Sequence, residues 1–277
     1  MPDYLIDDDN WKDEMNPVVD GEEMMTGAVP RDLTVQPYCS GEGAFDAADE
    51  MPLIPKSEWS ARIKEMEQTK SRLSDIRRTA LNGKPIPALD QNPQGYCWAY
   101  STGSAIMLAR AVANMPYVRI SPHAVACKIK NFRDQGGWGA LSMEFAVKNG
   151  YPSETYWPQK SMQRHNDNEQ TWQDAAKHRV THGWWDLSKD VYSRNLGFDM
   201  TMTLLMCRVP VVVDFSWWGH SICAMDPVEV EPGSFGIRIL NSWSDKWGDL
   251  GEAVLRGSKA HPDGSVAPRV VTGSVKS

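Results

Sequence analysis

The sequence has few cysteines, and none of them stand at the spacing of a metal or redox motif. The five cysteines occupy positions 39, 97, 127, 207 and 223, an odd number without a CxxC pair. This pattern argues against a disulfide framework and against a structural zinc site. It favours synthesis in a reducing compartment, so we expect a protein that is cytoplasmic at synthesis and uses no metal or cofactor.

Long apolar runs are absent as well. No stretch approaches the roughly 18 apolar residues of a membrane span, and the acidic start, Met1 to Asp9, lacks the apolar region of a secretion signal. The chain also has no internal repeat, no glycine-rich phosphate-binding loop and no stripe of basic and aromatic residues. These absences argue against membrane, nucleotide and nucleic-acid partners.

Charge is distributed unevenly along the chain. Residues 1–56 hold 14 acidic residues against Lys12, Arg31 and Lys56, a net charge of −11, whereas the whole chain carries −7. The remaining residues therefore carry about +4. An acidic tract of this kind is either a solvated tail or a segment that docks on the more basic remainder, as an inhibitory or assembly arm. Apolar residues within it, Trp11, Met24 and Met25 among them, would support docking.

The order of the predicted elements indicates an α+β protein. A helix is expected over about 57–79, with Ser57 as its N-cap, and Asn82-Gly83 ends it. Further helices are expected over 97–115, 121–129 and 141–148, and strands over 209–215, 220–225, 235–241 and 252–256. Helices followed by strands favour two lobes that meet at a cleft. Residues 158–198 give no clear pattern.

These elements predict a division into three segments. Residues 1–83 form an acidic extension, which we interpret as a prosegment or docking arm. Residues 84–257 form the main domain, and residues 258–277 form a C-terminal tail.

A turn rich in proline and glycine leads into a helix that begins at Cys97. A helix N-terminus favours an anion, so a thiol there is biased toward the nucleophilic thiolate. Gln91 lies six residues upstream, across the turn, where its amide N–H is able to meet an oxyanion that forms beside the sulfur. The alternative is a buried structural cysteine, which is common for this residue type.

A nucleophilic cysteine needs a base, and His220 is the strongest of six candidates. It follows Gly219 at the head of an apolar strand, a rigid position open to a cleft. Asn241 ends the neighbouring strand, where its amide oxygen can accept from the imidazole and fix its tautomer, with Trp243 above. Of the other histidines, we expect a capping or packing role for His123 and surface positions for His165, His178 and His182. His261 lies in the expected C-terminal tail.

Over roughly residues 86–257 the chain resembles the papain-like cysteine peptidases. The similar stretches are Gln91 with Cys97-Trp98-Ala99-Tyr100-Ser101, Gly136-Gly137, Asn149-Gly150-Tyr151 to Tyr156-Trp157-Pro158, His220, and Asn241-Ser242-Trp243 with Trp247-Gly248. The resemblance implies a papain-like two-lobe α+β fold, with Cys97 as nucleophile, His220 as its proton partner, Asn241 as orienting residue and Gln91 as oxyanion donor.

The same resemblance implies a substrate-binding set and a supporting set of residues. The substrate-binding residues are Gly136, Gly137, Trp138, Gly219 and Trp218. The supporting residues are Trp98, Trp243 and Trp247.

The chain departs from the family pattern at several positions. Gln94 and Asp134 stand where relatives have the half-cystines of one disulfide, and Cys127 has no evident partner. We therefore interpret the chain as a divergent member without the family disulfides. Tyr96 replaces a small residue before the nucleophile, which predicts a bulkier cleft floor. Only ten residues separate Pro210 from His220, with Trp217-Trp218 expected at the cleft edge.

The function that we predict is that of a thiol-dependent endopeptidase acting on a peptide or protein substrate. The mechanism implied by the resemblance pairs a Cys97 thiolate with a His220 imidazolium. The tryptophans Trp138 and Trp217-Trp218 predict a subsite that accepts apolar side chains. Two alternatives stay open. One is a catalytically silent scaffold in a larger assembly such as a virion, its cleft filled by Tyr96 or the acidic segment, and the other is a thiol hydrolase of cell-wall peptides or amides.

Overall fold

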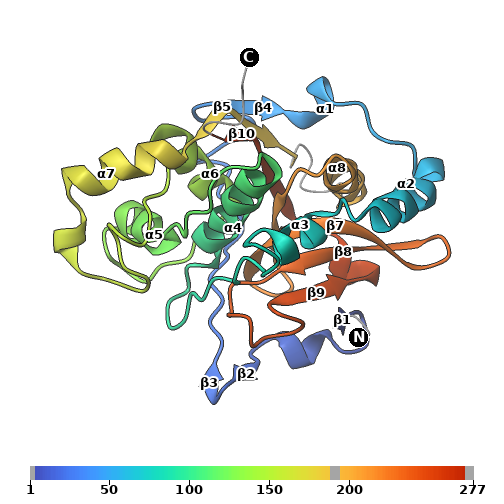
Figure 1. Cartoon of the computed structure of the whole chain (residues 1–277), viewed down its shortest axis with the longest axis horizontal. Coiled ribbons are helices and arrows are strands. Elements are labelled where there is room, and N and C mark those ends of the chain that lie inside the picture. The colour runs from blue at the N-terminus through green and yellow to red at the C-terminus, as the bar shows by residue number, and fades with distance from the viewer. Residues whose placement is uncertain (1–3, 188–193, 272–277) are drawn as a thin grey trace.

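The computed structural model describes residues 4–187 and 194–271. Figure 1 shows a mainly helical half, with α4 to α7, beside a half dominated by strands, with α4 running between them. The helices are α1 (Ala47–Glu50), α2 (Lys56–Thr69), α3 (Leu73–Thr79), α4 (Cys97–Val112), α5 (Pro122–Lys130), α6 (Gly139–Lys148), α7 (Glu169–Ala175) and α8 (Arg194–Met206). The strands are β1 (Leu5–Ile6), β2 (Val18–Val19), β3 (Glu22–Glu23), β4 (Ala44–Asp46), β5 (Val180–Asp186), β6 (Val211–Phe215), β7 (His220–Glu231), β8 (Ser234–Leu240), β9 (Glu252–Leu255) and β10 (Gly264–Val271).

Within the described residues, one eight-stranded sheet has the order β1-β9-β8-β7-β6-β10-β5-β4. The six inner strands pair antiparallel, and the short edge strands β1 and β4 pair in parallel with β9 and β5. The expected α+β class is confirmed. The predicted strands correspond to β6, β7, β8 and β9, and each apolar run lies in the part of the sheet that is buried.

The buried apolar side chains form two clusters, one for each lobe. The first surrounds α4, α5 and α6 and includes Trp98 and Met143. The second lies between the sheet and helices α2 and α8 and includes Trp59, Leu205 and Ile239. Two separate cores agree with the two lobes predicted from the order of the elements.

Close packing of α4 on α5 depends on a glycine. A Cβ atom at Gly103 would lie 2.5 Å from Cγ of Pro122, a distance that no side chain tolerates. Pro122 itself occupies the first turn of α5, where its missing N–H costs no helical hydrogen bond. The glycine in the sequence of α4 therefore sets how deeply the helix that begins at Cys97 packs into its lobe.

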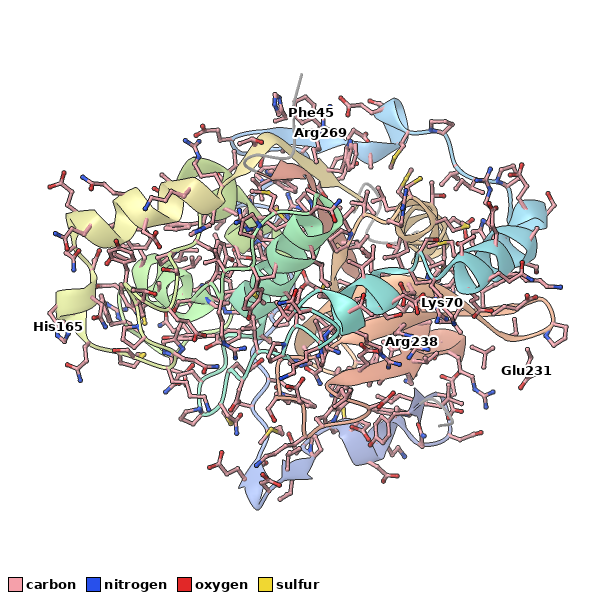
Figure 2. The ribbon with its side chains drawn as sticks, viewed as in Figure 1. Phe45, Lys70, His165, Glu231, Arg238 and Arg269 are labelled. Atoms are coloured by element: carbon pink, nitrogen blue, oxygen red, sulfur yellow. The ribbon has the colours of Figure 1, made fainter. Side chains whose placement is uncertain are left out.

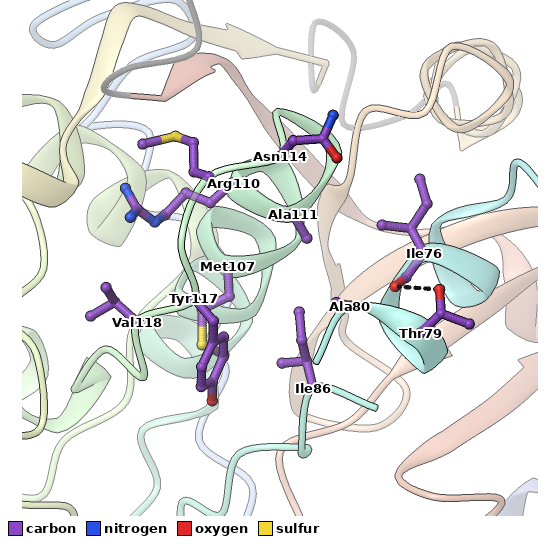
Figure 3. A pocket seen from close by; sticks show the side chains of 11 residues that line it. Ile76, Thr79, Ala80, Ile86, Met107, Arg110, Ala111, Asn114, Tyr117 and Val118 are labelled. Atoms are coloured by element: carbon purple, nitrogen blue, oxygen red, sulfur yellow. Dashed lines mark hydrogen bonds between the residues drawn. The ribbon is translucent and has the colours of Figure 1, made fainter. Parts of the chain in front are cut away.

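The single helix expected over about 57–79 is wrong, because the chain turns sharply in its middle. Lys70 adopts a left-handed backbone conformation with φ of 54° and ends α2, after which α3 begins at Leu73. The Ser71 N–H donates to the Met66 carbonyl at 3.1 Å and closes the last turn. Lys70 lies at this break (Figure 2). Ser57 is also not the N-cap, since α2 starts one residue before it.

The boundary expected at residue 83 does not separate two packing units. The Leu5–Ile6 strand pairs with β9, and the Ala44–Asp46 strand pairs with β5, so residues of the extension complete both edges of the sheet. Figure 2 shows Phe45 beside Arg269, whose guanidinium carbon lies 4.0 Å from the ring centroid. Strand pairing between distant segments leaves no local pattern, which is why the sequence did not reveal it.

A buried ion pair joins α3 to the sheet. The Arg77 side chain is completely buried, and its Nη1 lies 2.6 Å from Oε1 of Glu252, which is buried as well. Arg77 Nη2 also donates to Asp245 and to the carbonyl of Leu250. A buried charge needs such partners, because its desolvation is costly.

The expected C-terminal tail likewise contributes to the sheet. Gly264–Val271 forms β10, which lies between β6 and β5. Proline is uncommon in inner strands because it has no N–H to donate. At Pro268 the regular pairing of β10 with β5 is interrupted, since the register shifts between Pro268 and Val270. The segment over 158–198, which gave no clear pattern, contains α7 and β5, and its residues 188–193 lie outside the described part.

Candidate active site

Cys97 is the first residue of α4, as the turn before it predicted. Its side chain is completely buried. The residue before it, Tyr96, does not fill the cleft: its hydroxyl donates to the carbonyl of Arg133 at 3.0 Å, and its ring packs against Trp98 and His123. These contacts lie in the helical lobe. The bulky residue that the sequence placed beside the nucleophile therefore packs into the core.

His220 and Asn241 come together as expected from their places on neighbouring strands. His220 starts β7, Asn241 follows β8, and the two strands pair antiparallel. The imidazole Nε2 lies 2.8 Å from Oδ1 of Asn241. The ring of Trp243 stacks on the imidazole with centroids 4.5 Å apart and an angle of 19°. The amide oxygen holds the proton on Nε2, which leaves Nδ1 as the basic nitrogen.

The electrostatics of this pair differ from the predicted ion pair. Burial raises the pKa of the Cys97 thiol to about 12 and lowers the pKa of His220 to about 4. Both effects follow from loss of water around the charged form. Among the described residues, no hydrogen bond joins the thiol to the imidazole, and His220 Nδ1 is buried without a partner. Burial therefore favours the neutral form of both the thiol and the imidazole.

A segment of the N-terminal extension, residues 24–30, lies against the backbone on both sides of this site, and we call it the covering segment. Its Ala28 N–H donates to the carbonyl of Gly219 at 2.8 Å, and the Gly27 N–H donates to the same oxygen at 3.1 Å. On the other side, the Gly137 N–H donates to Gly27 and the Gly137 carbonyl accepts from Val29, at 3.1 and 2.9 Å. The covering segment thus bridges the two lobes.

A third contact holds the start of the covering segment. The Nε2 of Gln91 donates to the carbonyl of Met25 at 2.9 Å, and Nε1 of Trp243 donates to the same oxygen at 2.9 Å. Oε1 of Gln91 accepts a hydrogen bond from the Ser242 hydroxyl at 2.6 Å, which fixes the orientation of the Gln91 amide. A carbonyl oxygen of the protein therefore occupies the acceptor position toward which the Gln91 amide is directed.

Gly27 and Gly95 show how closely the covering segment approaches the turn before Cys97. A Cβ atom at Gly27 would lie 2.0 Å from the carbonyl oxygen of Gly95, and one at Gly95 would lie 2.6 Å from the carbonyl of Thr26. Gly136 is similarly close to the carbonyl of Gly27. Only glycine permits these backbone contacts.

The tryptophans predicted around the site are mostly structural in their contacts. Trp218 is almost completely buried, donates to the carbonyl of Glu14 at 2.6 Å and stacks on Trp217. Trp138 donates to the side chain of Gln36 at 2.6 Å. The remaining two, Trp98 and Trp247, pack against Gly137 and against Trp243.

The other histidines follow the predictions in part. His165 and His182 are exposed as expected, but His178 is buried, with Nδ1 2.9 Å from the carbonyl of Tyr151. His123 packs in the helical core, where Nδ1 lies 3.2 Å from the Tyr100 hydroxyl. His261 stacks on Phe198.

Residues that the sequence did not single out also contribute to the site. The backbone of Met25 contacts Gln91 and the backbone of Ala28 contacts Gly219, and such backbone contacts leave no side-chain pattern in the sequence. In the described part of the chain, no group of three or more His, Cys, Asp and Glu side chains is arranged to hold a metal ion. All five cysteines are free thiols, and none of the helices over residues 4–187 and 194–271 has the length and apolar character needed to cross a membrane.

No family model matches the chain. Mexicain from Jacaratia mexicana is 28% identical over 82 residues, which are 29% of this chain and 38% of that protein. The match thus spans well under half of the relative's length.

Three solved structures resemble the whole architecture. The cysteine protease xylellain from Xylella fastidiosa has a TM-score of 0.60 at 15% identity, and the comparison covers 89% of this chain and 97% of that one. Digestive procathepsin L2 from Tenebrio molitor also has a TM-score of 0.60, at 18% identity, covering 90% and 78%. Procathepsin B S9 from Trypanosoma congolense has 0.55 at 15% identity, covering 89% and 86%. None of these comparisons supports association with a virion. The chain has the fold of the papain-like cysteine proteases.

Proposed function

We propose that the protein is a thiol-dependent endopeptidase. Cys97 is the nucleophile, His220 the proton acceptor and donor, Asn241 the residue that orients the imidazole, and Gln91 an oxyanion donor. The observation that carries the proposal is the imidazole of His220 held by Asn241 at 2.8 Å under a stacked indole. A histidine fixed in one tautomer by an amide oxygen is the arrangement that general-base activation of a thiol requires.

The reaction follows from these positions. His220 Nδ1 takes the thiol proton, and the sulfur forms a bond to the peptide carbonyl carbon while the oxygen becomes an oxyanion. The Gln91 amide, which now donates to the Met25 carbonyl, stabilises that oxyanion together with the Cys97 N–H at the start of α4. The imidazolium then protonates the leaving amine. Water attacks the thioester, and the product acid and the thiol are released.

We further propose that the covering segment holds the enzyme inactive. Its backbone uses the polar groups that a substrate backbone would need, the carbonyls of Gly137 and Gly219 and the Gly137 N–H. The acidic extension therefore acts as an inhibitory docking arm, and removal or displacement of residues 24–30 is required for turnover. Two of the similar structures, those of Tenebrio molitor and Trypanosoma congolense, are named as procathepsins.

A silent scaffold is the second candidate, and one observation favours it. The Cys97 thiol and the His220 imidazole are both buried and neutral, a state in which the thiol is a poor nucleophile. If the covering segment never leaves, the fold serves only to bind partners through the outer face of its extension.

Hydrolysis of fluorogenic peptides separates the two candidates. The full chain and a Gly27→Ala variant are assayed beside the same proteins carrying Cys97→Ser. We expect slow hydrolysis by the full chain, faster hydrolysis by Gly27→Ala, and none by either Cys97→Ser form. Folded protein without hydrolysis in both Cys97-containing forms would establish the scaffold instead.

A further inference from the structure

A cavity of about 280 Å³ is lined in part by the covering segment and by Phe215, which pairs with His220 between β6 and β7. One wall is formed by the covering segment and the residues after it, from Ala28 to Leu33. The opposite wall belongs to the sheet and to α6, with Ala140, Asp214–Ser216 and Asp263–Val266. A water molecule takes about 30 Å³ of the liquid, so a space of this size has room for a long side chain.

The position of the cavity relates it to a bound peptide. The backbone of Ala28 and Val29 pairs with Gly219 and Gly137, and both residues also line the cavity. A substrate whose backbone uses the same groups of Gly137 and Gly219 therefore has a side chain at the cavity. Asp214 lies opposite Ser221 in the β6–β7 pairing, one position from His220.

The part of the cavity wall that lies outside the N-terminal extension carries two carboxylates. Asp214 Oδ2 accepts from the Gly139 N–H at 3.0 Å, whereas its Oδ1 is buried and meets no donor with hydrogen-bond geometry among the described residues. Asp263 also lines the cavity and accepts from the Ser216 N–H at 2.6 Å. Burial raises the pKa of Asp214 to about 6, although the nearby Ser221 hydroxyl and the Gly139 N–H act in the opposite direction. A carboxylate in such surroundings is stabilised by a cation.

The cation now near this carboxylate belongs to the extension. Arg31 is the one cationic residue among those that line the cavity, and its charge lowers the pKa of Asp214. The Arg31 guanidinium does not reach that carboxylate with a hydrogen bond. Instead, its Nη1 pairs with Asp186 at 2.7 Å, and its other nitrogens donate to the carbonyls of Gln36 and Pro37. When residues 24–30 are displaced, Asp214 and Asp263 remain in the wall of the cavity, while Arg31 stays engaged with Asp186.

We propose that this cavity is a specificity subsite for a lysine or arginine side chain of the substrate, with Asp214 as the residue that selects the charge. The inference rests on the proposed peptidase function and replaces the apolar subsite that we expected from Trp138 and Trp217-Trp218. Those indoles are engaged with Gln36, Glu14 and each other. A substrate cation in the cavity reaches the Asp214 carboxylate, to which Arg31 makes no hydrogen bond because its guanidinium is engaged by Asp186, Gln36 and Pro37.

Paired peptide substrates test the proposal in the Gly27→Ala protein. The peptides differ only at one position on the acyl side of the scissile bond, which carries arginine, lysine, norleucine or leucine, and each acyl-side position is varied in turn. We expect kcat/KM for arginine to exceed that for norleucine by about tenfold or more at one position, the selectivity of a charged hydrogen bond. Asp214→Asn should reduce that ratio to near one.

The required readout is the ratio of kcat/KM for the arginine and norleucine peptides, because the charge of Asp214 also raises the pKa of Cys97. A change in thiol reactivity alters both rates together and leaves the ratio unchanged. Asp226→Asn is the matched control: Asp226 is a buried carboxylate on β7 with a pKa raised to about 6, and it faces Ser74 and Arg238 instead of the cavity. This variant should keep the arginine preference. A preference for norleucine, or a preference that Asp214→Asn does not change, overturns the proposal.

A binding measurement distinguishes failure of the subsite from failure of the peptidase function. The Gly27→Ala, Cys97→Ser protein is titrated with the arginine and norleucine peptides by calorimetry. If no variant hydrolyses any peptide, tighter binding of the arginine peptide that Asp214→Asn abolishes still supports the subsite. Equal binding of the two peptides contradicts it, whether or not the protein is a peptidase.

Discussion

The side-chain amide of Gln91 donates a hydrogen bond to the carbonyl of Met25, 2.9 Å away and 66 residues earlier in the chain. The donor that the proposed mechanism assigns to an oxyanion is thus engaged by the protein's own backbone. The same segment passes between Gly137 and Gly219, and the thiol beneath it is buried and neutral. The protein's own N-terminal extension therefore covers the proposed site residues.

We predict that His220 supplies most of the thiolate character of Cys97 once the site is uncovered. In the Gly27→Ala protein, the thiol should titrate near the low pKa of a histidine-paired cysteine, about 3 to 4. His220→Ala should move that pKa several units toward the free-thiol value, because a helix dipole alone contributes only about 0.3–1 kcal/mol. The measurement is the pH dependence of thiolate absorbance, with Cys97→Ser subtracted. An unchanged titration would refute the assigned role of His220.

Acidification should loosen the covering segment. The pKa of His220 is lowered by burial to about 4 in the covered protein. In Cys97→Ser, where no thiol can give its proton to the imidazole, that pKa rises to about 6.5 where water reaches the ring. Between these two pKa values the covered form binds fewer protons than the open form. The free energy that favours the covered form is therefore greatest above pH 6.5 and falls as the pH drops toward 4. The pKa of Asp214 is raised to about 6 in the covered protein. Where the covering segment causes that shift, the covered form binds a proton at Asp214 more readily than the open form, and this effect opposes that of His220.

Hydrogen exchange of the amides of residues 27–29 in the Cys97→Ser protein, corrected for the intrinsic effect of pH, measures this opening. We expect protection to fall between pH 6.5 and 4, and to fall further when Asp214→Asn is added to Cys97→Ser, because the opposing group is then absent. Protection that stays constant over this interval in both proteins would mean that the protonation of His220 is not coupled to the cover.

Loss of the buried ion pair between α3 and the sheet should destabilise the whole fold. Arg77→Ala leaves Glu252 buried with only Arg78 and the more distant Arg238 as partners. Truncating one member of a buried pair costs about 3–5 kcal/mol. Arg62→Ala is the control, since Arg62 pairs with Glu58 on the exposed face of α2 and should cost well under about 1 kcal/mol. Urea unfolding monitored by tryptophan fluorescence distinguishes the two, and equal midpoints would contradict the structural role of Arg77.

The catalytic candidates were predictable because their signals are local. A turn before Cys97 and the polar residues at the ends of two apolar strands are visible in the sequence, and the structure brings His220 and Asn241 together as predicted. The assigned roles of Cys97, Gln91 and the substrate-binding residues stay predictions. The positions of α4, α5 and α6 followed from apolar periodicity, but α4 ends at Val112 instead of about 115 and α6 begins at Gly139 instead of 141.

Contacts between distant segments were not predictable in the same way. The covering segment binds through backbone atoms of Gly27, Ala28 and Val29, which no side-chain pattern encodes. The β10 strand, with Pro268 and a shifted register, has little resemblance to an inner strand. The break at Lys70 depends on a left-handed residue other than glycine, an uncommon conformation with weak sequence preference.

Intact-mass analysis after reaction with a peptidyl epoxide that alkylates cysteine proteases tests the central claim most directly. The proteins are the full chain, Gly27→Ala, and Gly197→Ala as a matched control, since a Cβ at Gly197 meets nothing within 4 Å. We predict a single adduct on Cys97 that forms slowly in the full chain and in Gly197→Ala and many times faster in Gly27→Ala. Equal rates in all three proteins, or labelling that Cys97→Ser does not abolish, would contradict an assembled active site held closed by its own covering segment.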